Sequence, residues 1–447
     1  MAQSHNLLSG KISSQLVLLA LPLVVGEILQ QLYNTVDSLI IGRFLGTEAF
    51  AAAGVSGSVM NLFIFVLSGF CIGVSVLFSR DYGAADMNSF RRTCYTAVVF
   101  GTAFTLLVSL VAVCLTAPVL RLMATPEDLL PYCRRYLTII LSGLITTYFY
   151  NLFSAILRAI GKTGMALLFL AVSVGANVVL DLLLVAVIPL GIGGAAAATV
   201  LAQLVSAVSC LVFLSKKYPQ LLCRKEDTGY YPELLKQIFS YGTTSALHQS
   251  SLYIGKLMVQ GIVNTCGTAV IAAFTATTRI EAFINSPGNG FAQAEAVFVA
   301  QNRGAGNRKR ALQGIKASFV LIEGFVLIFS VIMFFAAPHA IRLFLAPGET
   351  EALRAGTEYL KVIFFFYFLG YGGYFFVGAA RGYGKMQVPL TATTMHLTAR
   401  ILFAWFTIGR FGLSAVAWAT GFGWLLSCCY HSLMFRRYTA ADRPELQ

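Results

Sequence analysis

The sequence contains few charged residues, and this shortage limits what the protein can be. Only 11% of the 447 residues are Asp, Glu, Lys or Arg, whereas a water-soluble domain carries about 25%. Hydrophobic residues make up 57% of the chain, and the mean hydropathy is +0.75. So little polar surface could not cover such an apolar interior in water. The composition therefore indicates an integral membrane protein.

Other features are missing as well. No stretch of about 100 residues is polar enough to form a soluble catalytic domain, and no HExxH or comparable catalytic motif is evident, so we do not expect an enzyme. The nine cysteines include no CxxC pair. They are expected to pack in apolar runs rather than to bind metal or form disulfides. The first apolar run is too long for a cleavable signal, so we expect it to be retained.

Long apolar runs are what the sequence has instead. Runs of about 20 residues can cross the hydrocarbon core as helices, and breaks that contain charged residues, Gly or Pro separate twelve of them. The predicted spans cover residues 12–41, 49–78, 93–118, 133–157, 164–188, 194–215, 236–263, 268–300, 312–336, 357–380, 387–408 and 413–434. We therefore predict an all-α integral membrane fold with twelve transmembrane helices.

The two halves of the chain repeat one another. GTEAFAAA at 46 returns as GTAVIAAF at 267, GAAD at 83 as GAGN at 304, and GIGGAAAAT at 191 as GLSAVAWAT at 412, and the offset is the same in all three pairs. A fourth pair, around Arg158 and Arg381, has a slightly longer offset, which a short slip in a loop explains. Because each repeat has six spans, both enter the membrane in the same direction and are related by a pseudo-two-fold axis along the membrane normal.

This repeat predicts two six-helix lobes. The N-terminal lobe would cover residues 1–215 and the C-terminal lobe residues 236–437. A cytoplasmic linker at 216–235 would join them, and a cytoplasmic tail at 438–447 would follow.

Basic residues predict the orientation. The net charge of +13 reflects Lys and Arg in loops near anionic lipid, so we expect no nucleic-acid partner. With the N-terminus inside, 21 basic residues fall in cytoplasmic segments and eight on the opposite side, while Lys256, Arg279 and Arg400 lie within spans. Since basic loops stay in the cytoplasm, we expect a multi-pass protein of the cytoplasmic (inner) membrane with both termini inside.

Acidic side chains within spans are the first candidates for function, since a carboxylate in the hydrocarbon region is costly. Four polar residues of the first span follow one another at steps of three, four and three and so share one helical face: Glu27, Gln30, Asn34 and Asp37. Pro22 removes a backbone hydrogen bond near the inner end and marks an expected bend. The alternative is a stripe that only packs one bundle against another.

The fifth and sixth spans add polar groups at a comparable depth. Asn177 and Asp181 are four residues apart, and the turn near Leu190 lies nine residues from both Asp181 and Thr199. At about 1.5 Å per residue, Asp181 and Thr199 lie roughly 13 Å below the same surface, and Asp37 is somewhat shallower. These oxygens suit a small cation such as Na⁺, and close carboxylates would equally hold a proton. The sequence leaves Na⁺ and H⁺ open.

The second half has a different polar set. The repeat places no carboxylate at the positions equivalent to Asp37 and Asp181, so coupling chemistry is expected in the first half only. Lys256, Arg279 and Glu281 fall near one depth in the seventh and eighth spans. They either contact substrate or compensate one another's charge.

The tenth span carries an aromatic face. Tyr367, Tyr371 and Tyr374 follow at spacings of four and three. Such rings could hold an organic cation. Aromatic packing or an interfacial belt is the alternative explanation.

Together these segments resemble the multidrug and toxic compound extrusion (MATE) family. LPLVVGEILQQLYNTVDSLIIGRFLGTEAFAAAG, NVVLD, GIGGAAAAT and QNRGAGN carry the resemblance, which covers essentially the whole chain. It implies a secondary active exporter of two six-helix lobes that expels organic, often cationic, compounds in exchange for Na⁺ or H⁺. It also implies a cation site at Asp37, Asn177, Asp181 and Thr199, and a first helix that bends at Pro22. The acids that some members use in the seventh and tenth helices are missing here.

We therefore predict a cation-coupled multidrug antiporter that acts as a monomer in the bilayer on small organic substrates. It needs no cofactor and no metal beyond a coupling Na⁺. One alternative is a flippase for lipid-linked precursors from the same superfamily, which Lys256, Arg279 and Arg400 keep open. An ion channel is disfavoured because no re-entrant filter interrupts the spans.

Overall fold

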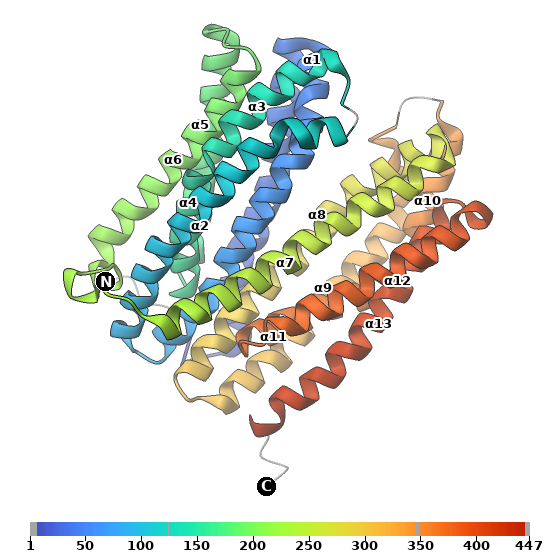
Figure 1. The fold of residues 1–447 in the computed structure, drawn as a ribbon. Helices are drawn as coiled ribbons and strands as arrows, with labels where there is room; N and C mark the ends of the chain where they lie inside the picture. Colours follow the sequence, from blue (N-terminus) through green and yellow to red (C-terminus); the bar gives the residue numbers. More distant parts are fainter. Residues whose placement is uncertain (1–6, 124, 346–347, 443–447) are drawn as a thin grey trace. The chain divides into compact units, whose positions relative to one another are not determined.

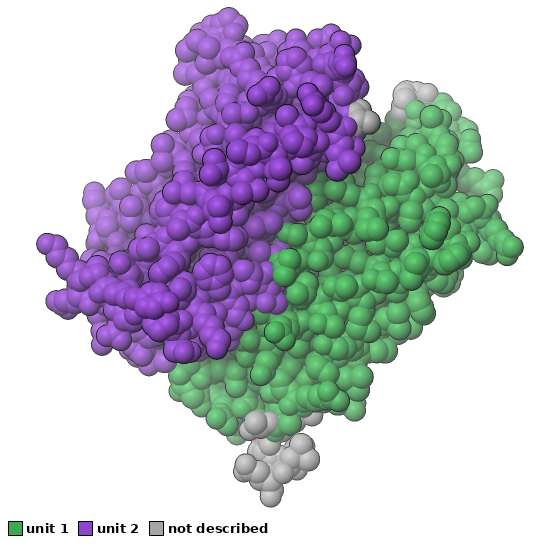
Figure 2. All heavy atoms as spheres, viewed as in Figure 1, with its two compact units in different colours: residues 1–24, 247–447 green, residues 25–246 purple. Residues whose placement is uncertain are grey.

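The computed structural model describes residues 7–123, 125–345 and 348–442, and within these ranges every regular element is a helix (Figure 1). The chain divides into two compact units (Figure 2). One unit comprises residues 25–246, and the other comprises residues 1–24 together with residues 247–447.

The first half of the chain contains α1 to α6. The elements are α1 (Ile12–Gly83), α2 (Met87–Leu122), η1 (Glu127–Leu129), α3 (Leu130–Ser142), α4 (Leu144–Ala159), α5 (Thr163–Asp181), the π-helical turn η2 (Leu182–Val187) and α6 (Ile192–Lys217). Two short turns, η3 (Pro219–Leu221) and η4 (Lys225–Asp227), form the linker that leads to the second half.

The second half contains α7 to α13. The elements are α7 (Pro232–Val263), η5 (Asn264–Cys266), α8 (Thr268–Gly304), α9 (Arg308–Arg342), α10 (Thr350–Phe364), α11 (Tyr367–Gly382), α12 (Gln387–Phe411), α13 (Leu413–Thr439) and η6 (Ala440–Asp442). The predicted tail at 438–447 thus begins within α13, and residues 443–447 lie outside the described ranges.

The twelve predicted spans lie almost entirely within these helices, which confirms the fold class. Helix α1 holds the first two spans, and its backbone leaves the helical region at Gly46. The fourth span is α3 and α4 with a bend of 44°, and the tenth is α10 and α11 with a bend of 57°. The apolar pattern did not reveal these two bends, because the residues around each break, near Gly143 and near Phe365, are mostly apolar.

The backbone itself carries the repeat. Residues with positive φ occur at Gly46, Ala85, Gly161 and Gly191 in the first half. Their counterparts with positive φ in the second half are Gly267, Gly306, Gly384 and Gly412. These pairs have the same offsets as the motifs that repeat in the sequence. Positions with positive φ favour glycine, because a residue with a Cβ is strained there. The duplicated motifs therefore form the same turns in each half.

The unit of residues 25–246 encloses a core of aromatic and small side chains. Phe70 stacks on Phe104 with ring centroids 5.4 Å apart, and the buried Tyr148 donates a hydrogen bond of 2.6 Å to the Ala97 carbonyl. Gly101 makes room for that hydroxyl, since a Cβ at this position would overlap it. These contacts fix α2 against α4.

The other unit begins with the first residues of α1. Leu16, Leu19 and Leu23 form a cluster with Val297 and Phe298 of α8. The chain therefore passes from one unit to the other after residue 24 within α1, and again after residue 246 within α7. The distance along the chain between these two crossings is nearly the same as the distance between the repeated motifs. The crossings therefore lie at equivalent positions in the two repeats. Each predicted lobe contained its first helix whole, whereas the observed units divide α1 and α7 between them.

We expect Gly73 of α1 to be essential for packing against the first part of α7. A Cβ at Gly73 would overlap the Tyr241 carbonyl, and backbone atoms cannot rotate away. Gly73→Ala should therefore cost about 1–3 kcal/mol of unfolding free energy, seen as a lower thermal unfolding temperature of the detergent-solubilised protein. Gly57→Ala, where a Cβ meets open space, is the matched control. An unchanged unfolding temperature for Gly73→Ala would contradict this packing.

Candidate functional site

Asp37 lies on α1 in the unit of residues 25–246. Its side chain is half-buried, and its Oδ1 is buried without a hydrogen-bond donor. Gln30 is also half-buried on α1, whereas Asn34 is exposed. The stripe predicted on this helix thus includes one acid with an unsatisfied oxygen.

Asp181 and Asn177 lie one turn apart on α5 and are almost fully buried. Their exposed fractions are 0% and 1%, and none of their side-chain oxygen and nitrogen atoms has a hydrogen-bond partner. Asp181 is also the last α-helical residue before the chain widens into the π-helical turn η2. Such turns are frequent at functional sites. The sequence pattern, which predicted one regular span over 164–188, did not reveal this change.

The two carboxyl groups are neighbours. Asp37 and Asp181 lie close enough for a hydrogen bond between their side chains when one of them carries a proton. When both are ionised, neither can donate, and their buried oxygens remain unsatisfied. Two adjacent charges without donors are costly in a low-dielectric interior. The arrangement therefore favours a bound cation or a bound proton.

Hydroxyl groups surround this pair. The Tyr33 hydroxyl lies 3.5 Å from Thr199 Oγ1, so α1 and α6 meet at this level. Tyr33 and the buried Tyr136 of α3 are both within electrostatic range of Asp37 and Asp181. The sequence pattern indicated no role for either tyrosine. Tyr33 could have been found from its place one turn before Asp37, whereas Tyr136 carries no sequence signal.

The remaining stripe residues have separate surroundings. Glu27 is half-buried and within electrostatic range of Arg158 on α4, whose Nη1 donates a hydrogen bond of 2.9 Å to Ser154. Pro22 lies inside α1, and the backbone around it is helical. Within α1 the backbone leaves the helical region only at Gly46. The functional bend at Pro22 therefore stays a prediction.

The polar residues of the other unit also gather, but not as expected. Glu281 of α8 accepts hydrogen bonds of 3.2 and 3.3 Å from the buried Tyr359 of α10. Among the described residues, no salt bridge within 4 Å joins Glu281 to Lys256 or Arg279. The expected charge compensation therefore does not occur by direct ion pairing.

The aromatic face of the tenth span is largely buried. Tyr367 and Tyr371 have exposed fractions of 2% and 1%, and the Tyr371 hydroxyl donates to the Ile284 carbonyl. Tyr374 packs against Tyr371 in a T-shaped pair at 5.8 Å. These positions fit the packing alternative.

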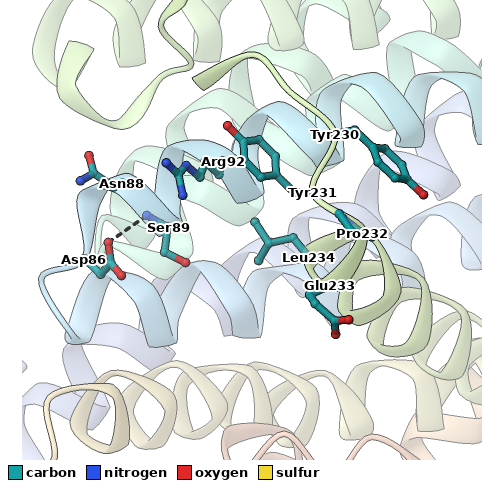
Figure 3. Close-up of a pocket in the computed structure, with 9 residues that line it drawn as sticks. All are labelled: Asp86, Asn88, Ser89, Arg92, Tyr230, Tyr231, Pro232, Glu233 and Leu234. Atoms are coloured by element: carbon teal, nitrogen blue, oxygen red, sulfur yellow. Dashed lines mark hydrogen bonds between the residues drawn. The ribbon is translucent and has the colours of Figure 1, made fainter. Parts of the chain in front are cut away.

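A surface pocket of about 540 Å³ lies elsewhere in the unit of residues 25–246, where the linker meets the start of α2 (Figure 3). Its lining residues are Asp86, Asn88, Ser89, Arg92, Tyr230, Tyr231, Pro232, Glu233 and Leu234. None of the predicted site residues lines it. The described residues also contain no group of three or more His, Cys, Asp or Glu placed to hold a metal ion.

Comparison with known proteins assigns the family. The MatE family model matches residues 22–183 and again residues 245–406. The chain belongs to the MATE family. Because one model matches each half, the comparison also confirms the internal duplication.

Relatives in this family of membrane transporters match along nearly the whole chain. The probable multidrug resistance protein YpnP of Bacillus subtilis is 28% identical over 438 residues, 97% of both proteins. The multidrug export protein MepA of Staphylococcus aureus is 22% identical over 402 residues, which cover 90% of this chain and 88% of MepA. A solved outward-facing multidrug resistance MATE transporter has a TM-score of 0.91 at 23% identity, covering 99% of each chain.

The buried carboxylate pair predicts a gain of stability on neutralisation. In alkaline, Na⁺-free buffer we expect Asp181→Asn to raise the thermal unfolding temperature, because it removes one of two neighbouring buried charges. A gain of about 1–3 kcal/mol is expected. Asp128→Asn, at an exposed position in η1, should change nothing. A lower unfolding temperature for Asp181→Asn would show that the ionised pair is already satisfied.

Proposed function

We propose that this MATE transporter exports organic compounds by antiport with Na⁺ or H⁺ and that the cation binds between Asp37 and Asp181. The observation that carries the proposal is the pair of neighbouring carboxyl groups with buried, unsatisfied oxygens on α1 and α5. An intramembrane acid of this kind is expensive to keep without a function.

The chemistry of the surrounding groups supports a small cation. Two carboxylates, the Asn177 amide oxygen and the Thr199 hydroxyl are hard oxygen ligands of the kind that suit Na⁺. A proton shared between the carboxyls would satisfy the same two charges. Thr199 Oγ1 already donates to the Ala195 carbonyl at 3.2 Å, so its lone pairs stay available to a cation.

Coupling follows from the cost of the empty site. Without a cation, the two charges repel each other, and a conformation that separates or hydrates them is favoured. With a cation, the pair is neutralised and the buried conformation becomes stable. A difference in cation affinity between two conformations shifts their populations, and substrate release on the outside would use this shift.

The relatives support the substrate class. YpnP and MepA are named for multidrug resistance and multidrug export, so we propose small organic compounds as substrates here. The flippase alternative is not favoured, because no relative named above carries that function.

Transport measurements test the coupling site. In proteoliposomes we expect an imposed Na⁺ or H⁺ gradient to drive ethidium uptake by inside-out wild-type protein and not by Asp37→Asn or Asp181→Asn. The loss should be at least about tenfold, because each change removes one of the two charges that bind the cation. The gradient that works identifies the ion.

Asp128→Asn is the matched control, since it makes the same change at an exposed site. Uptake that persists in both site variants would contradict this coupling site. Absence of uptake in the wild type with either gradient would contradict the antiport itself.

We also propose that both termini and the linker lie in the cytoplasm. Cys223 of the linker is exposed. The test uses a variant in which the other cysteines are replaced. In intact cells we expect a membrane-impermeant maleimide to leave Cys223 unlabelled. After the cells are permeabilised, the same reagent should label it. A single cysteine at Asp128, in the segment predicted outside, should be labelled directly. Labelling of Cys223 in intact cells would reverse the orientation.

A further inference from the structure

In the unit of residues 1–24 and 247–447, three basic residues lie within the predicted spans toward one end of their helices. Lys256 lies seven residues before the end of α7, Arg279 eleven residues after the start of α8, and Arg400 eleven residues before the end of α12. At about 1.5 Å per residue, these positions are roughly 10 to 16 Å from the same end of the unit. Arg279 and Arg400 are therefore deeper than surface-anchoring residues at helix ends.

The two arginines lie near Lys256. Lys256 is within electrostatic range of Arg279, Arg400 and Glu281. Helices α7 and α12 also touch at this level, since Gly255 lies against Leu397, and a Cβ at Gly255 would overlap that side chain. The cluster thus combines three helices and three positive charges around one carboxylate.

Glu281 offsets only part of the positive charge of this cluster. Its carboxylate accepts the Tyr359 hydroxyl, and no salt bridge within 4 Å joins any of the three cations to an acid among the described residues. Arg400 Nε is buried without a hydrogen-bond acceptor. Two positive charges therefore remain uncompensated at this depth, and a buried donor of Arg400 is left unused, which is costly in a membrane.

The composition of the three helices agrees with a polar surface. Six helices of the described chain, together with two bent pairs, are long and apolar enough to cross a membrane by themselves, and α7, α8 and α12 are not among them. Apolar side chains flank the cluster nevertheless: Leu257, Met258 and Leu402 are exposed. A ligand that fits both features has an acidic group and an apolar body.

We propose that Lys256, Arg279 and Arg400 bind the anionic group of an amphiphile, a carboxylate, sulfonate or phosphate, so that the substrates include acidic or zwitterionic compounds. Lys256 and Arg279 are exposed and can meet such a group, while Arg400 supplies its unused donor. Guanidinium groups suit these anions because they donate in a planar fork. The substrate role rests on the proposed export function, whereas the binding site does not.

Equilibrium binding tests the site directly. We expect the detergent-purified full chain to bind the anionic amphiphile anilinonaphthalene sulfonate, followed by its fluorescence. Lys256→Gln and Arg400→Gln should each weaken this binding by about tenfold, since each removes a charge next to the anion. Arg410→Gln removes the same charge from α12 outside the cluster and should leave the affinity unchanged. Ethidium binding should not weaken in any of these variants.

A second variant distinguishes loss of the binding site from misfolding of the protein. Glu281→Gln keeps an acceptor for Tyr359 but removes the only negative charge of the cluster, so we expect it to bind the sulfonate at least about threefold more tightly. A damaged protein would not gain affinity. Equal sulfonate affinity in the wild type, Lys256→Gln, Arg400→Gln and Glu281→Gln would overturn the proposal.

Lipid composition distinguishes an anionic lipid headgroup from a free organic anion as the ligand of this site. In nanodiscs of phosphatidylcholine alone the sulfonate should bind as in detergent. If phosphatidylglycerol displaces it, the site holds an anionic lipid headgroup; if not, the site takes free organic anions. Charge-dependent binding without gradient-driven uptake would leave the site standing and remove the export function. Gradient-driven ethidium uptake, together with sulfonate binding that does not depend on these charges, would remove the anion site and leave the export function standing.

Discussion

The constraint on which this structure depends is that charged and polar groups in the hydrocarbon region must be satisfied within the protein. Helices solve the problem for the backbone, which explains why every regular element in the described ranges is helical. In the described ranges, few charged side chains keep a buried atom without a hydrogen-bond partner. Asp37 and Asp181 in one unit and Arg400 in the other are among them. Since such groups are costly without partners, we propose that small ions or substrates interact with them.

Duplication produced two similar scaffolds with different polar content. Both halves share the glycine turns, such as Gly191 and Gly412, because the backbone needs them in each copy. The side chains inside the spans are not constrained in this way. The first copy therefore holds neighbouring carboxyl groups, whereas the second holds a cluster of cations around Glu281. A transporter that binds a cation in one unit can use the other for a different ligand.

The sequence predicted much of this arrangement, and its failures have physical causes. The spans and the repeat follow from hydrophobicity and glycine motifs, whereas the shared depth of Asp181 and Thr199 stays a prediction from helical spacing. Long-range partners such as Tyr136 and Tyr359 could not be predicted, since any of the 19 tyrosines could pack at those places. The π-helical turn after Asp181 depends on local backbone geometry that the apolar run Leu182–Val187 does not encode.

The division of α1 between the units gives this helix a particular role. Residues up to Val24 belong to one unit and residues from Val25 to the other, so one continuous helix carries both Leu23 and Asp37. Pro22 lies just before the crossing and removes a backbone hydrogen bond there. A missing backbone hydrogen bond therefore lies next to the point where the helix changes unit. We expect a change in the charge state at Asp37 to act on the same helix, and we expect a proline at this place to let the helix bend between its two parts.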